Sequence, residues 1–324
     1  MINLGIRVAS EEKLGKGHLE RCLAIRSHFK GNVFWFFDSK NKAILSRISK
    51  KDKYFFEGNS KSYTKLKLKV FQNIINLVLL DTYKINLKNF NSDIGKVPIA
   101  YIADKYTKEI FNILISPQPY LYKKNDSKIL LSGLKYAPIS KKIYNFKKIK
   151  RGKKLNILVS MGAFDSSGVT LVVISSIKKL LKLGLDFNVR IVLGEKSPII
   201  NEVKKAIIND NKFKLFIGTK KMNYLYNYTD IAIGAPGLSH FERMLIGIPT
   251  VLIAQNHQHK VLFQNWKQLS GTIIADNNID SIKIKLQELI KNTVLRDKIK
   301  SINKKLIDGN GAKRIADTIY KSSK

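Results

Sequence analysis

The chain has 324 residues, of which 44% are hydrophobic and 10% aromatic, so it is long enough for two ordinary domains with buried cores. This composition excludes a largely disordered protein, and the single cysteine, Cys22, excludes an internal disulfide framework and a multi-cysteine metal site. The 59 Lys and Arg residues outnumber 24 Asp and Glu, and the resulting net charge of +35 is expected to attract polyanions.

The lysines are spread over the whole length, which is typical of a solvated basic surface. A field that steers phosphorylated substrates, a weak association with an anionic membrane surface and a nucleic-acid contact are the alternatives. We expect no nucleic acid partner, because the sequence carries no helix-turn-helix, aromatic RNA-binding signature or zinc finger. Residues 1–7 have the pattern of a buried strand rather than a signal peptide, so we expect a cytoplasmic protein.

Short apolar runs alternate with segments of helical period, which is the pattern of parallel sheets covered by helices on both faces. In the first part of the chain we expect a helix at 17–29 and strands at 4–8, 33–37, 77–80, 99–102 and 113–115. In the second part we expect strands at 155–159, 187–193, 215–217, 231–233 and 250–253, and helices at 167–183, 199–208, 222–228, 239–246 and 261–269, with two terminal helical segments beyond them.

The pattern predicts an α/β protein with two Rossmann-like domains. Residues 1–140 form the first domain, residues 141–154 a basic linker, and residues 155–324 the second domain. In open parallel sheets the ligand binds beyond the carboxyl ends of the strands, so we expect a binding cleft between the domains and candidate residues in the loops that follow strands.

The first such loop includes Gly15 and Gly17, which would let a ligand approach the backbone at a helix N-terminus, where negative charge is favoured. His18 follows in the first helical turn, and Arg21 in the same segment is a candidate substrate ligand. A neutral imidazole suits a general base near neutral pH, whereas the alternative for His18 is a capping or packing role.

Three loops of the second domain hold further candidates. The loop with Gly162, Asp165 and Ser167 is either a site for a diphosphate or sugar or an ordinary capped turn. In the loop with Gly237, Ser239 and Glu242, Ser239 is a candidate helix cap, and Glu242 either closes a capping box or accepts hydrogen bonds from ribose hydroxyls. Amides such as those of Asn256 and Gln258 both donate and accept hydrogen bonds, which suits sugar hydroxyls.

The remaining signals concern metals and the first domain. His240, His257 and His259 have no carboxylate or cysteine partners at metal-ligand spacing, and no Asp-x-Asp pair occurs, so we expect no metal and no cofactor. Asp81 and Asp104 each follow an apolar strand at the expected ligand edge. Tyr83 is either a cleft residue or a half-buried aromatic.

Taken together, these loops resemble the sugar-nucleotide hydrolases of pseudaminic acid biosynthesis and the related spore-coat polysaccharide proteins. The resemblance spans most of the chain, and the order and spacing of its motifs are more specific than any one motif. It rests on residues 15–22, 81–83, 133–139, 161–165 and 230–256. The sequence departs from the family pattern at Gly162-Ala163, at Pro236, at His257 and at Ile102-Ala103-Asp104.

The resemblance implies the glycosyltransferase-B architecture and metal-independent hydrolysis of a UDP-activated diacetamido-trideoxyhexose at the anomeric carbon. It implies that His18 is the catalytic histidine, that Tyr83 and Asn256 are active-site residues, and that Glu242 binds the nucleotide. The departures leave two rivals open. One is a glycosyltransferase of the same fold, and the other is a basic protein that binds nucleic acid or a membrane surface.

Overall fold

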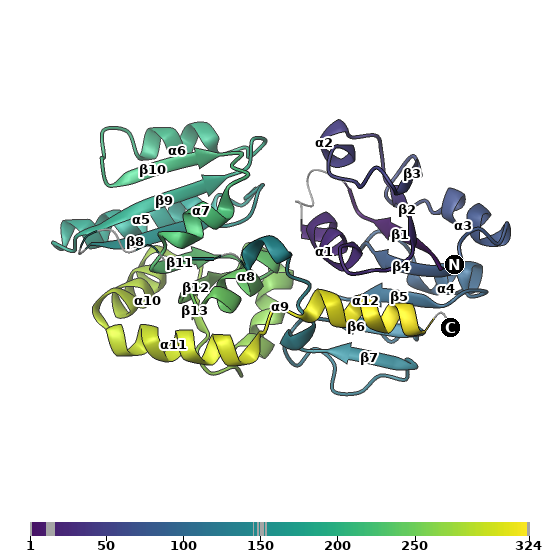
Figure 1. Ribbon diagram of the computed structural model, residues 1–324. Coiled ribbons are helices and arrows are strands. Elements are labelled where there is room, and N and C mark those ends of the chain that lie inside the picture. The colour runs from purple at the N-terminus through teal and green to yellow at the C-terminus, as the bar shows by residue number, and fades with distance from the viewer. Residues whose placement is uncertain are drawn as a thin grey trace. The chain divides into compact units, whose positions relative to one another are not determined.

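A computed structural model describes residues 2–10, 17–144, 146–147, 149, 152 and 154–322. The chain divides into two compact units (Figure 1). Unit 1 consists of Met1–Ser140 and Gly309–Lys324, and unit 2 consists of Lys141–Asp308. Both are α/β units with a parallel sheet, which confirms the predicted fold class.

Unit 1 is built on a seven-stranded parallel sheet in the order β3-β2-β1-β4-β5-β6-β7. The central strands are runs of buried apolar residues because helices cover both faces of the sheet. The strands are β1 (Asn3–Val8), β2 (Asn32–Phe37), β3 (Lys53–Phe56), β4 (Leu77–Asp81), β5 (Ile99–Ile102), β6 (Ile113–Ser116) and β7 (Ile129–Ser132).

One face of this sheet packs against α1 (Gly17–Arg26) and α12 (Gly311–Lys321) through a core that includes Cys22, Ile25 and Ile315. The other face packs against α3 (Thr64–Phe71) and α4 (Leu87–Ile94), which contribute Leu66 and Phe90. Two short elements complete the unit, α2 (Lys42–Leu45) and the 3-10 helix η2 (Leu134–Tyr136).

Unit 2 has a six-stranded parallel sheet in the order β10-β9-β8-β11-β12-β13. Its core joins the sheet to α5, α6 and α10. The strands are β8 (Leu155–Ser160), β9 (Phe187–Leu193), β10 (Phe213–Ile217), β11 (Ile231–Gly234), β12 (Thr250–Ile253) and β13 (Ile273–Ala275). The helices are η3 (Lys141–Ile143), α5 (Val169–Lys182), α6 (Ile200–Ala206), α7 (Met222–Asn227), α8 (Leu238–Ile246), α9 (His257–Trp266), α10 (Ile279–Lys291) and α11 (Thr293–Leu306).

The last helix corrects the predicted domain boundaries. Residues 309–324 were expected in the second domain, but they belong to unit 1, where α12 packs against α1 and η2 (Figure 1). The physical reason is its apolar stripe, since Ala312, Ile315 and Ile319 are buried in the core of unit 1. Arg314 also donates from Nη1 to the carbonyl oxygen of Lys135, at 2.9 Å.

Several elements were not predicted. The strands β3, β7 and β13 all lie at sheet edges and are only partly buried. The short helices α2, α3 and α4 were also missed. The start of α9 was expected at residue 261, but this helix begins at His257 because the Asn256 side chain caps it.

The expected linker, residues 141–154, contains structure that the basic composition concealed. Residues 141–143 form η3, in which Ile143 is buried, and this stretch is part of unit 2. Asn223 donates from its side chain to the carbonyl oxygen of Lys142, and the Lys147 amide donates to Asn227 at 3.2 Å. Residues 145, 148, 150, 151 and 153 lie outside the described residues.

The packing of α12 predicts that Ile315→Ala destabilises unit 1. Removing a fully buried isoleucine side chain costs about 2–5 kcal/mol. The chain offers one tryptophan per unit, so urea unfolding in a Trp266→Phe background reports unit 1 through Trp35. Lys313→Ala, an exposed position of the same helix, is the control. Equal unfolding midpoints for the two variants would show that α12 does not stabilise unit 1.

Candidate functional site

A cluster of polar side chains gathers at the carboxyl end of the unit 1 sheet. His18 and Arg21 come from the first turns of α1, and Asp81 is the last residue of β4. Tyr83 follows β4, and Asp104 lies two residues beyond β5, the neighbouring strand. Parallel strands end at the same edge, so these carboxylates meet the start of α1 there. We call these five residues the His18 cluster.

His18 and Asp81 form a buried dyad. The His18 Nδ1 atom lies 2.6 Å from Asp81 Oδ1. The Arg21 Nη2 atom is also 3.1 Å from this nitrogen, but it can only donate. Because the ionised carboxylate can only accept, Nδ1 carries the proton of this hydrogen bond, and in a neutral ring the lone pair would then lie on Nε2. No described residue forms a hydrogen bond with Nε2, so this atom is available to take a proton.

Arg21 was expected to bind substrate, but its guanidinium is engaged inside the cluster. Its Nε atom donates to Asp81 Oδ2 at 2.6 Å, and its Nη2 atom donates to Asp81 Oδ1. Its Nη1 atom contacts both oxygens of Asp104, at 2.9 and 2.7 Å. The planar fork matches two carboxylates at once, so Arg21 bridges Asp81 and Asp104.

The ion pairs set the charge states of the buried groups. Burial opposes ionisation of Asp81, but the charge of Arg21 and the contact with His18 outweigh it, so the pKa of Asp81 lies well below its usual range. Burial alone would lower the pKa of Arg21, yet the carboxylates of Asp104 and Asp81 raise it well above its usual value. Arg21 therefore lies as a cation between the carboxylates of Asp81 and Asp104.

Tyr83 completes the cluster on its exposed side. Its hydroxyl donates to Asp104 Oδ2, and its ring packs edge-on against His18, with ring centres 4.6 Å apart at 75°. Burial of the phenol raises its pKa well above the usual value, and the charge of Asp104 adds to the rise. With 38% of its surface exposed, Tyr83 is a neutral donor at the edge of the site rather than a core aromatic.

Cys22 lies beneath the cluster. Its Sγ atom is 3.3 Å from Asp81 Oδ2, and burial raises the pKa of the thiol well above its usual value. A buried neutral thiol is a poor nucleophile, so Cys22 serves as a small core residue. Of the two predicted glycines, Gly17 is the first residue of α1, whereas Gly15 lies outside the described residues.

In unit 2, Asp165 accepts hydrogen bonds at the start of α5. It is buried, and its carboxylate accepts hydrogen bonds from the amides of Val169 and Thr170 at 3.2 and 2.9 Å, and from Gln255 Nε2 at 3.0 Å. It therefore satisfies the first amides of α5, the capping role that was the alternative expectation. Gly162 and Ser167 are exposed in the same loop, and Ser167 donates to the carbonyl oxygen of Gln255 at 2.8 Å.

The loop after β11 leads into α8 at Gly237, which occupies the N-cap position with φ 146°. Ser239 is therefore inside the helix rather than its cap, and the predicted capping box with Glu242 does not form around it. Glu242 is half-buried, and Glu242 Oε2 accepts a hydrogen bond from the Tyr226 hydroxyl at 2.9 Å. Burial of Tyr226 raises its pKa well above the usual value, and the charge of Glu242 adds to the rise.

Asn256 and Gln258 lie at the start of α9, where both are exposed. Asn256 Oδ1 accepts from the His259 amide at 2.9 Å and caps the helix, which leaves its amide nitrogen for other contacts. The structure thus brings His18 and Tyr83 together in unit 1, whereas Asn256 belongs to unit 2.

One residue that the sequence did not single out, Arg243, carries a buried polar group next to the loop after β11. Arg243 on α8 is fully buried, and burial lowers its pKa. Its Nη2 atom lies 3.3 Å from the carbonyl oxygen of Ala235.

Among the described residues, no group of three or more His, Cys, Asp or Glu side chains could hold a metal ion. The described part of the chain also contains no helix long and apolar enough to cross a membrane.

The family model described as "Glycosyl transferases group 1" matches residues 141–306, slightly more than half of the chain. The chain belongs to this family. An uncharacterized protein of Methanocaldococcus jannaschii is 26% identical over 285 residues, which are 80% of the chain and 57% of that protein. The spore coat polysaccharide biosynthesis protein SpsG of Bacillus subtilis is 26% identical over 167 residues, 49% of the chain and 48% of SpsG.

The chain spans about half the length of these two curated relatives. Among solved structures, the glycotransferase of kitacinnamycin has a TM-score of 0.72 at 11% identity, with 99% of each chain covered. The MnaA–UDP co-structure from S. aureus has a TM-score of 0.72 at 14% identity, covering 98% and 96%. MurG of Acinetobacter baumannii has a TM-score of 0.70 at 11% identity, covering 99% and 100%. These likenesses confirm the glycosyltransferase-B fold.

The depressed pKa of Asp81 predicts acid-sensitive stability of unit 1. A carboxylate with a lowered pKa stabilises the fold above its unfolded pKa of about 3.9, and this contribution disappears as the pH falls further. Asp81→Asn should cost about 3 kcal/mol near neutral pH, because it removes one partner of a buried ion pair. Urea unfolding followed through Trp35 should show that the difference in free energy of unfolding between this variant and the parent chain becomes smaller below about pH 4.

The control is Asp126→Asn, an exposed carboxylate of the same unit. It should unfold like the parent chain at every pH. If the loss of unfolding free energy in Asp81→Asn stays constant as the pH falls below about 4, the assigned charge state of Asp81 is contradicted.

Proposed function

We propose that the chain is a nucleotide-sugar enzyme in which unit 2 binds UDP. The family match covers residues 141–306, nearly all of unit 2, and the similar S. aureus structure is a complex with UDP. Gly237 and Ser239 would hold the diphosphate at the start of α8, where backbone amides and the helix dipole favour negative charge. Glu242 would bind the ribose hydroxyls, with Tyr226 orienting its carboxylate.

The exposed loops of unit 2 supply further contacts in this proposal. Gly162 has φ 101° and no described atom lies near its missing Cβ, so a phosphate or sugar can approach the backbone there. Ser167, Asn256 and Gln258 present exposed polar groups to sugar hydroxyls or amides. Asp165 shapes the loop from beneath.

His18 is the general base of the proposed reaction, and the single observation that carries this role is the His18–Asp81 dyad. Asp81 fixes the imidazole with its proton on Nδ1, so Nε2 accepts a proton from the attacking hydroxyl. The carboxylate of Asp81, which contacts Nδ1, stabilises the imidazolium that results. Arg21 acts through Asp81 and Asp104 as a positioning residue, and Tyr83 orients the sugar or the nucleophile.

Water is the proposed nucleophile. Its oxygen bonds to the anomeric carbon as the bond from that carbon to the UDP oxygen breaks, and UDP leaves with the electron pair. The proton of the water passes to His18 and then to solvent. UDP is already a good leaving group, so the amides at helix N-termini and nearby cations suffice to stabilise its charge. The resemblance of the loops to the pseudaminic acid hydrolases supports a UDP-activated diacetamido-trideoxyhexose as substrate.

Transfer of the sugar to an acceptor hydroxyl is the second candidate. The family description and the glycotransferase of kitacinnamycin favour it, and His18 would deprotonate an acceptor hydroxyl as readily as water. UDP release that depends on an added acceptor would identify this reaction.

The test is turnover of the UDP-activated diacetamido-trideoxyhexose in oxygen-18 water. Anomeric attack predicts label in the free sugar and none in UDP. His18→Gln should lower the rate by about 10²–10⁴-fold, because it removes the base while UDP binding to unit 2 stays unchanged. His28→Gln, a histidine of unit 1 outside the His18 cluster, should turn over at the parent rate.

Label in UDP would exclude attack at the anomeric carbon. Parental turnover by His18→Gln would remove the base assignment even if hydrolysis occurs. Acceptor-dependent UDP release that still requires His18 would replace hydrolysis by transfer and retain the base.

A further inference from the structure

The helix α3 of unit 1 exposes apolar side chains that its sequence pattern would ordinarily bury. Residues 64–71 read Thr-Lys-Leu-Lys-Leu-Lys-Val-Phe, an alternation suited to a strand with one buried face. Folded as a helix, this segment buries only Leu66 and Val70, which are four residues apart. Leu68 and Phe71 are left outward, with 53% and 47% of their surfaces exposed.

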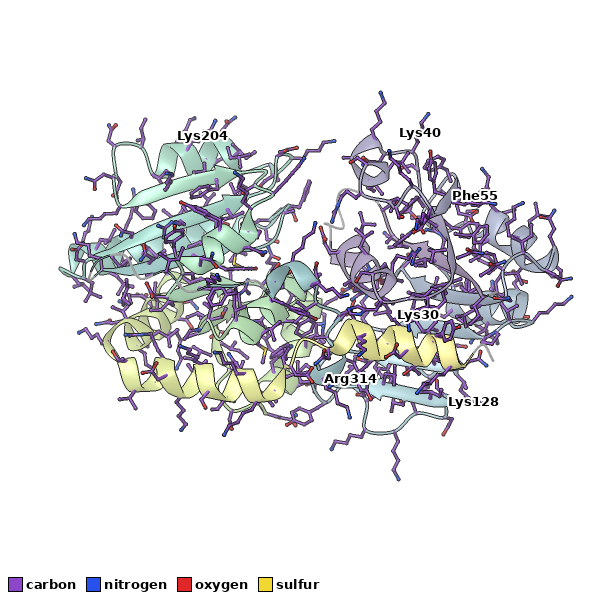
Figure 2. All side chains as sticks on the ribbon, in the orientation of Figure 1. Lys30, Lys40, Phe55, Lys128, Lys204 and Arg314 are labelled. Carbon is purple, nitrogen blue, oxygen red and sulfur yellow. The ribbon has the colours of Figure 1, made fainter. Side chains whose placement is uncertain are left out.

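Lysines surround these two side chains. The Nζ atoms of Lys96 and Lys67 lie 4.4 and 6.0 Å from the centre of the Phe71 ring. On the edge strand β3, the Phe55 ring has Lys69 Nζ at 5.7 Å from its centre (Phe55 is labelled in Figure 2). We call this surface the α3 patch. It consists of Leu68 and Phe71 with Lys65, Lys67, Lys69 and Lys96.

The charge of the α3 patch is strongly positive. Among the described residues, the ion pair formed by its lysines is that of Lys67 with Asp93, at 3.0 Å. Asp93 also accepts a hydrogen bond from Tyr63. The patch therefore keeps three lysine charges after this pair is counted, beside two exposed apolar side chains.

We propose that the α3 patch docks unit 1 onto an anionic lipid surface. Long lysine side chains reach lipid phosphates while their methylene stems lie along the surface, and the apolar side chains between them enter the acyl boundary. The combination of both features fits a bilayer better than either a neutral protein surface or a polyphosphate alone. This inference goes beyond the proposed function, because lipid binding does not require UDP-sugar turnover.

Nucleic acid fits the α3 patch less well. Single-stranded nucleic acid binds through aromatic faces on which bases stack. The ring of Phe71 is contacted by Lys96 and Lys67, and the other exposed apolar side chain, Leu68, is aliphatic. The patch thus offers positive charge to a polyanion but little stacking surface.

The experiment is co-sedimentation of the full chain with vesicles of phosphatidylcholine, with and without phosphatidylglycerol. The parent chain should bind the anionic vesicles, more weakly at high salt, and not the neutral ones. Leu68→Ser with Phe71→Ser should lower the partition coefficient by roughly tenfold or more. Changing Lys65, Lys69 and Lys96 to Gln should lower the partition coefficient by roughly tenfold to a hundredfold.

Matched controls come from unit 2. Ile208→Ser with Val294→Ser removes two apolar side chains that are more exposed than those of the α3 patch. A second control changes three exposed lysines to Gln, namely Lys204, Lys205 and Lys298 (Lys204 is labelled in Figure 2). Both controls should bind anionic vesicles within about twofold of the parent chain, since we place the contact on unit 1 alone. Unfolding curves verify that each variant is folded.

Three outcomes would overturn the proposal. Equal losses in the patch and control lysine variants would mean that diffuse charge, not the α3 patch, binds the lipid. Unchanged binding by the Leu68 and Phe71 variant would remove the apolar insertion. If the patch variants lose binding to single-stranded RNA but still bind anionic vesicles, the α3 patch is an RNA-binding surface instead. Turnover in solution is measured separately, so a failure here leaves the proposed hydrolysis standing.

Discussion

The buried carboxylate of Asp81 needs positive charge, and the arrangement of the His18 cluster follows from that need. A carboxylate at the end of a central strand is costly to desolvate unless it is paired. Arg21 supplies the charge through Nε and also donates from Nη1 to Asp104. Asp104 in turn accepts a hydrogen bond from the Tyr83 hydroxyl. His18 takes the remaining side of Asp81 and thereby acquires a fixed ring orientation. One ion pair thus determines where the base and its neighbours lie.

The central part of the fold could be predicted from the sequence because buried parallel strands are uninterrupted apolar runs. The strands around β1, β4, β8 and β11 were found in this way. The elements that escaped prediction are those whose identity depends on tertiary contacts. The alternating pattern of α3 gives no helical signal, and the return of α12 to unit 1 is a long-range packing choice that local periodicity does not contain.

The candidate site could be located from the sequence more readily than its roles could be assigned. His18, Tyr83, Asp81 and Asp104 were found as strand-end or helix-start residues, and the structure brings them together. A sequence cannot show that Arg21 pairs with two carboxylates or that Asp165 accepts from the first amides of α5. Whether Glu242 caps a helix or accepts from Tyr226 likewise depends on atoms far apart in sequence. The ligand roles of these residues remain predictions.

The proposed role of His18 as a base depends on its tautomer, which nitrogen-15 NMR measures without any substrate. The His18 resonances are assigned by their absence from a His18→Gln spectrum. At a pH where the ring is neutral, we predict a proton on Nδ1 and an unprotonated Nε2, with both tautomers populated when Asp81→Asn removes the fixed acceptor. A proton on Nε2 in the parent chain would contradict the assignment of His18 as the general base.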